Sequence, residues 1–121
     1  MGEPSSLVPP TLFVSSDPML LETRLRLLQQ AGLVALPAEP AHVATVLREY
    51  QFEVLILCNS LTLQDKREVL AQFKSRYPSG RVVSVISVEQ THMVDADIEM
   101  QTPVMPLDWE TLSGVLKEGR S

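Results

Sequence analysis

The sequence predicts a single α/β domain in which helices cover both faces of an open parallel sheet. Short apolar runs suited to buried strands alternate along the chain with longer segments whose apolar residues recur at helical spacing. The run Val54–Leu57 contains no polar residue, as expected for a central strand buried on both faces. The chain has 121 residues, 45% of them hydrophobic, which is enough for one core.

The first strand and helix carry the clearest boundary signals. Thr11–Val14 is a short apolar run followed by small polar residues, which favours a buried strand and its exit loop. Asp17 is placed to cap a helix that starts at Pro18, because proline has no N–H to lose there and the carboxylate accepts from the next free amides. Gly32 is placed to end this helix. Its inner face is predicted to carry Leu21, Leu25 and Leu28.

The later elements follow by the same reasoning. A second strand is predicted over 33–36 and a loop over 37–40, and three further strands are predicted over 54–57, 81–86 and 98–100. The second helix is predicted to face inward with Val43, Val46, Leu47 and Tyr50. The third helix, over 63–77, is predicted to face inward with Val69, Leu70 and Phe73. A last helix over 109–117 is predicted, capped by Asp108. Its Trp109 is either an interface anchor or packed over the sheet edge.

Charge and cysteine content exclude several classes of protein. A formal net charge of -5 repels a phosphate backbone, so direct nucleic-acid binding is not expected. The basic residues of two predicted helices alternate with acids and are interpreted as solvated faces: Arg24, Arg26, Lys66, Arg67, Lys74 and Arg76. One cysteine and no CxxC spacing favour a reducing cytoplasm and no metal site. No signal peptide or membrane span is indicated. We expect a flexible arm over 1–10, the domain over 11–118 and a tail over 119–121.

Three segments resemble, in the same order, conserved segments of the receiver domain of two-component response regulators (CheY-like). They are TLFVSSDP, FEVLILCNSL and MPLDWETL. The resemblance covers residues 11–118. It implies a flavodoxin-like three-layer fold with a five-stranded parallel sheet in the order 2-1-3-4-5, whose ligands sit at the carboxyl ends of strands one and three. Between Ser87 and Asp95 there is room for about one turn where an ordinary helix has roughly three, so the fourth helix is expected to be shortened or missing.

The resemblance also implies a phosphorylation pocket, which this sequence has lost. In the family, acids after strand one hold Mg²⁺, an aspartate after strand three accepts the phosphoryl group, a hydroxyl after strand four binds it, and a lysine before proline pairs with it. The acid pair falls here on Ser15 and Ser16, leaving only Asp17, and the acceptor falls on Cys58. The remaining positions fall on Ile86 or Ser87 for the hydroxyl, and on Thr102 or Met105 for the lysine.

We therefore predict a degenerate pocket without Mg²⁺, cofactor or catalytic residue, in a protein that is not an enzyme. Phosphoryl transfer needs metal and lysine charges that neutralise the developing anion, and neither Thr102 nor Met105 is cationic. The predicted function is a phosphorylation-independent pseudo-receiver that binds a protein partner or itself, in bacterial signal transduction or transcription control. The alternative is a small-molecule or redox sensor that uses an uncharged pocket around Cys58.

Overall fold

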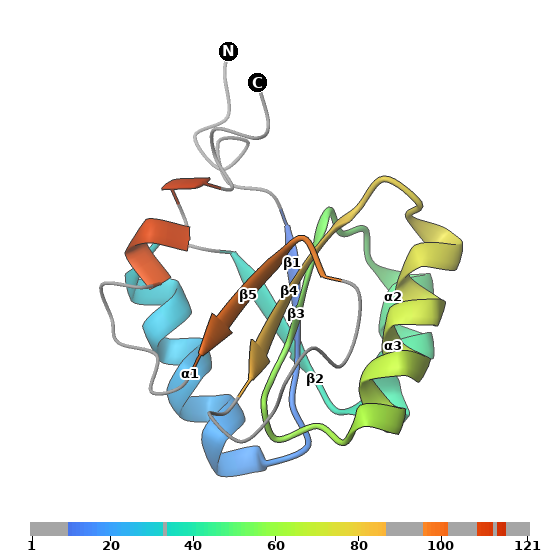
Figure 1. The fold of residues 1–121 in the computed structure, drawn as a ribbon, viewed down its shortest axis with the longest axis horizontal. Helices are drawn as coiled ribbons and strands as arrows, with labels where there is room; N and C mark the ends of the chain where they lie inside the picture. The colour runs from blue at the N-terminus through green and yellow to red at the C-terminus, as the bar shows by residue number, and fades with distance from the viewer. Residues whose placement is uncertain (1–9, 33, 87–95, 102–108, 113, 116–121) are drawn as a thin grey trace.

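Five parallel strands form one sheet in the order β2-β1-β3-β4-β5 in the computed structural model (Figure 1). The structure describes residues 10–32, 34–86, 96–101, 109–112 and 114–115. The strands are β1 (Thr11–Val14), β2 (Ala35–Ala38), β3 (Val54–Leu57), β4 (Arg81–Ile86) and β5 (Ile98–Gln101). The fold class and strand order that the sequence predicted are confirmed. The shortened fourth helix was predicted within residues 87–95, which lie outside the described residues.

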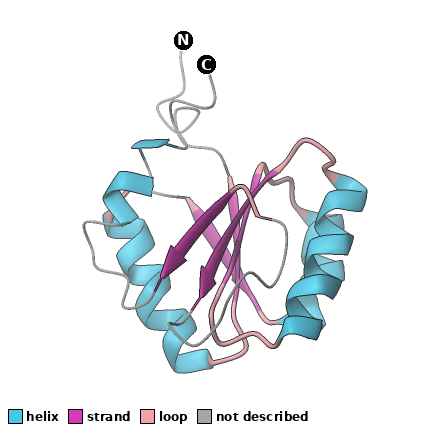
Figure 2. Ribbon diagram, in the orientation of Figure 1, coloured by secondary structure: helices cyan, strands magenta, loops and turns pink. Residues whose placement is uncertain are grey.

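Helices cover both faces of the sheet, so the molecule has three layers (Figure 2). One face carries α1 (Pro18–Gln30) and the helical residues 109–112 and 114–115. The other carries α2 (Val43–Glu49), which follows a short 3₁₀ turn, η2 (Pro40–His42), and α3 (Leu63–Arg76). Within the described ranges, no helix combines the length and apolar character needed to cross a bilayer.

Alternate residues of each strand enter two separate cores, which is why β3, in the middle of the sheet, contains no polar residue. Leu55 and Leu57 pack with α2 and α3, whereas Val54 and Ile56 pack with α1 and the last helix. Trp109 is fully buried in the second core. Of its two predicted roles, packing is therefore confirmed and an exposed interface anchor is wrong.

The helix ends follow the predicted signals. The Asp17 Oδ1 accepts a hydrogen bond from the Met19 N–H at 3.0 Å, which confirms the cap of α1. Gly32 ends the helix with a φ of 90°, a left-handed conformation that favours glycine. The Thr62 hydroxyl caps α3 by accepting from the Asp65 N–H at 3.1 Å.

Two predicted details are wrong. The second strand begins and ends two residues later than predicted, because Pro37 and Ala38 pair with Phe13 and Val14 of β1 instead of forming a loop. An edge strand tolerates the proline, since only one side of it is paired in the sheet. Tyr50, predicted on the inner face of the second helix, follows α2 and is 52% exposed.

Candidate functional site at the carboxyl ends of β1 and β3

The candidate site is formed where the neighbouring strands β1 and β3 end. Ser15 and Ser16 directly follow β1, and Cys58 directly follows β3. The Cys58 N–H donates to the Val14 carbonyl at 3.0 Å, which extends the pairing of the two strands by one residue. Ser15 and Cys58 are fully buried, whereas Ser16 is exposed. The structure thus brings together the residues predicted for the metal and phosphoacceptor positions.

Serine hydroxyls join the loop after β1 to the loop after β3. The Ser15 and Ser60 hydroxyl oxygens lie 2.9 Å apart within hydrogen-bond distance, and the Ser16 hydroxyl donates to the Ser60 carbonyl at 2.9 Å. The Ser16 N–H also donates to the Ser60 hydroxyl at 3.2 Å. At the two positions where the resemblance places carboxylates, the chain therefore has neutral hydroxyl groups that are bonded to Ser60. Ser60 was not among the predicted site residues.

Arg24 of α1 reaches Cys58, the residue at the predicted phosphoacceptor position. Its Nη1 donates to the Cys58 Sγ at 2.8 Å and to the Asn59 Oδ1 at 2.5 Å. The Cys58 thiol lies 3.6 Å from the same Asn59 oxygen and donates to it. Arg24 is half-buried, so its assignment to a solvated helix face is wrong.

Lys66 of α3 brings a second cation to this end of the sheet. Its side chain is fully buried, and its Nζ donates to the Ser84 Oγ at 3.2 Å and to the Val85 carbonyl at 3.0 Å. Burial lowers the pKa of Lys66 below its ordinary 10.5, because the charged form loses its water, and attraction to Cys58 and Glu99 acts in the opposite direction.

The interpretation of Lys66 as a solvated residue is wrong as well. A signal in the sequence could have found it, since Lys66 precedes the inward-facing Val69 and Phe73 by three and seven residues, on one face of a helix. The expectation of an uncharged pocket is also wrong, because the cations come from α1 and α3. The positions Ser87, Thr102 and Met105 lie outside the described residues.

The donors at this site do not fit Mg²⁺. Magnesium prefers hard oxygen ligands, usually one or two carboxylates, in a near-octahedral arrangement. The Asp17 carboxylate accepts from the Met19 N–H at the start of α1, and the serine hydroxyls bond to one another. Among the described residues, no three His, Cys, Asp or Glu side chains are grouped so as to hold a metal ion. The two cations near Cys58 add electrostatic repulsion to any divalent cation.

Comparison by sequence gives no relative: no protein-family model matches the chain, and no curated protein matches it. Comparison of structures finds many proteins with a similar fold. The signal receiver domain of a putative Luxo repressor protein from Vibrio parahaemolyticus superposes with a TM-score of 0.74 at 12% identity, over 93% of this chain and 92% of that one. A CheY-like receiver domain protein from Methanospirillum hungatei gives 0.73 at 19% identity, over 94% and 99%.

A third similar structure is the receiver domain of a sensor histidine kinase from Pseudomonas aeruginosa, with a TM-score of 0.76 at 7% identity, over 92% of this chain and 98% of that one. That structure has a magnesium ion coordinated in its active-site cleft. The strand order, the three layers and these superpositions together establish that the chain has the CheY-like fold of response-regulator receiver domains.

Proposed function

We propose that this chain is a phosphorylation-independent receiver-fold domain that acts in bacterial signal transduction or transcription control by binding a protein partner or a second copy of itself. It is not an enzyme, and it does not contact nucleic acid directly. A cytoplasmic location accords with this role and with the unpaired Cys58.

One observation carries the proposal: the acceptor position holds a buried thiol already bonded to the Arg24 guanidinium. An aspartyl phosphate cannot form where there is no carboxylate. The two positions after β1 that would supply metal ligands are occupied by Ser15 and Ser16, whose hydroxyls bond to Ser60. A receiver fold retained with this pocket has kept a scaffold for contacts and lost the groups needed for phosphoryl transfer.

The test is incubation of the purified protein with acetyl phosphate and Mg²⁺, followed by intact mass spectrometry. We expect no phosphoryl adduct, while a phosphorylatable response regulator in the same reaction gains one. A stoichiometric adduct on the wild-type chain would overturn the proposal. Repeating the reaction with Cys58→Ser would then show whether the thiol is the acceptor.

The interaction role is tested by affinity capture from the source cytoplasm with and without acetyl phosphate. We expect the same partner in equal yield under both conditions, because its binding does not depend on a phosphoryl group. Capture that requires acetyl phosphate would contradict this expectation. Sedimentation of the isolated protein separates self-association from binding of another protein.

A redox role for Cys58 is the second candidate, and the contact with Arg24 favours it. A cationic side chain beside the sulfur is a feature of reactive cysteines, although such cysteines are also partly exposed, and Cys58 is fully buried. Alkylation by iodoacetamide in the native state discriminates the two functions. Fast alkylation that slows in Arg24→Ala supports redox sensing, whereas alkylation that proceeds only on unfolding supports a packing role.

A further inference from the structure

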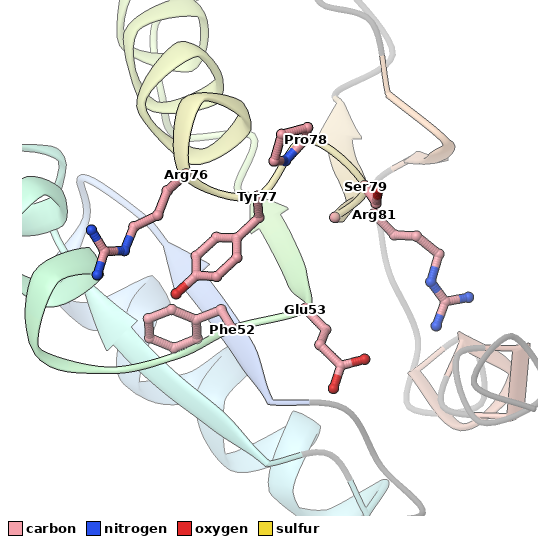
Figure 3. Close-up of a pocket in the computed structure, with 8 residues that line it drawn as sticks. Phe52, Glu53, Arg76, Tyr77, Pro78, Ser79 and Arg81 are labelled. Atoms are coloured by element: carbon pink, nitrogen blue, oxygen red, sulfur yellow. The ribbon is translucent and has the colours of Figure 1, made fainter.

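A pocket of about 470 Å³ lies at the amino ends of β3 and β4, the opposite end of the sheet from Cys58. The residues before β3 supply Phe52 and Glu53, the end of α3 supplies Arg76 and Tyr77, and β4 begins with Arg81. In Figure 3 the Tyr77 ring is turned toward Phe52, and Arg76 and Arg81 lie on opposite sides of this aromatic pair. The pocket therefore combines an aromatic wall with a cation on each side.

Two further hollows share residues with this pocket. One of about 280 Å³ lies between α2 and α3, and contains Arg48 together with Arg76. Another of about 260 Å³ at the start of β1 and β2 shares Phe52, and contains Val34 and Tyr50. Val34 and Tyr50 are among the most exposed large apolar residues of the described chain, at 54% and 52%. We call these three hollows, which adjoin at the shared lining residues Phe52 and Arg76, the amino-end groove.

The charge of the groove is opposite to that of the chain. Among the described residues, its charged lining residues are three arginines, Arg48, Arg76 and Arg81, and one acid, Glu53, whereas the whole chain carries a formal charge of -5. Arginine and aromatic residues are the types enriched at protein interfaces and at their energetic hot spots. The groove therefore complements a ligand that has both acidic groups and apolar side chains.

Hydrogen bonds and close packing hold the groove in shape. The Tyr77 hydroxyl donates to the Tyr50 carbonyl at 3.2 Å, and the Lys74 Nζ donates to the Gly80 carbonyl at 2.6 Å. The Arg81 N–H donates to the Glu53 carbonyl at 3.0 Å. A preformed surface loses less conformational entropy on binding than a flexible one, which favours its use for recognition.

We propose that the amino-end groove docks an extended acidic segment of a partner protein in which acidic residues alternate with apolar ones. The inference rests on the proposed function as an interaction module and names the class of partner. An extended segment fits better than a compact ligand, because the arginines are distributed over two of the hollows and the exposed apolar residues Val34 and Tyr50 line the third. A nucleic-acid strand fits less well, because Glu53 interrupts the cationic lining and the chain as a whole repels a polyanion.

The test is fluorescence anisotropy with a labelled pool of octapeptides in which Asp or Glu alternates with Leu or Tyr. We expect the peptides to bind, with an affinity that falls as salt is added. The substitutions Arg76→Glu and Arg81→Glu should each lower the affinity by at least about fivefold. Arg67→Glu is the matched control, because Arg67 is exposed on the same helix and does not line the groove. Its affinity should stay within about twofold of wild type. Circular dichroism confirms that each variant is folded.

Three results would overturn the docking proposal. The first is that the folded protein does not bind the peptides at about millimolar concentration. The second is that a pool with Lys and Arg in place of the acids binds with equal affinity, and the third is that a thymidine oligonucleotide binds more tightly than the acidic peptides. An equal loss in Arg67→Glu would have the same consequence, since it indicates general electrostatic attraction. Amide shifts in an NMR titration should cluster at Tyr77 and Gly80 and spare Ser60. If the peptides do not bind and acetyl phosphate gives no adduct, the docking proposal is refuted and the proposed phosphorylation independence stands.

Discussion

Replacing Lys66 by methionine tests the electrostatics of the site most directly. The substitution keeps an unbranched chain of similar length and removes the ammonium group, which donates to the Ser84 Oγ and the Val85 carbonyl. Two effects oppose one another at neutral pH. The variant avoids the several kcal/mol that desolvation of a buried ion costs, and it leaves two buried acceptors without this donor, at about 1–3 kcal/mol each. The net change at pH 7 is therefore small compared with either effect.

The pH dependence isolates the charge of Lys66. Burial lowers the pKa of Lys66 in the folded protein below its ordinary 10.5. Between the lowered value and 10.5 the unfolded chain binds more protons than the folded one, so the stability of the wild type rises with pH in this window. The slope relative to Lys66→Met approaches about 1.4 kcal/mol per pH unit for one proton. Below the window both states hold the proton, and the difference between the two proteins is constant.

The assay is urea unfolding of wild type and Lys66→Met at half-unit steps from pH 6 to pH 10.5, with unfolding free energies compared at each pH. We expect the difference between wild type and variant to be flat at low pH and then to rise in favour of wild type. Arg67→Met, which removes an exposed charge from the same helix, should give a flat difference throughout. A difference for Lys66→Met that stays flat to pH 10.5, or that falls, would refute the burial of a desolvated lysine.

Three further predictions concern stability and can be checked by thermal and urea unfolding. Gly80→Ala should destabilise the protein by about 1–3 kcal/mol, because an added Cβ would lie 2.5 Å from the buried Phe73 ring. Gly114→Ala should not destabilise it, because a Cβ there meets nothing within 4 Å. Equal losses of stability in the two variants would contradict this reasoning. Thr62→Ala should cost about 1 kcal/mol by removing the cap of α3, and Thr62→Ser should retain it. Ser60→Ala should cost about 1 kcal/mol, since the buried Ser15 hydroxyl loses its hydrogen bond with Ser60 and the Ser16 N–H loses its acceptor, while Ser15 keeps its hydrogen bonds with the Asp17 backbone; an unchanged unfolding midpoint would show that the serine network does not contribute.

Local signals in the sequence were sufficient for most of the elements. The cap at Asp17 and the stop at Gly32 depend on a few neighbouring residues, and both are confirmed. The second strand was misplaced by two residues because its limits depend on pairing with β1, which lies more than twenty residues away in the chain. The order of the strands followed from the resemblance to receiver domains, and similar solved structures support it.

The sequence by itself determined that Ser15, Ser16 and Cys58 bring hydroxyls and a thiol to positions where the resemblance to receiver domains places carboxylates, because side-chain chemistry does not depend on the fold. Only the tertiary structure decided which charges replace them. Arg24 and Lys66 lie in helices rich in charged residues, and their destinations depend on how α1 and α3 pack against the sheet. The amino-end groove likewise joins residues from separate segments of the chain. Such sites arise from contacts between residues distant in sequence, which local periodicity cannot reveal.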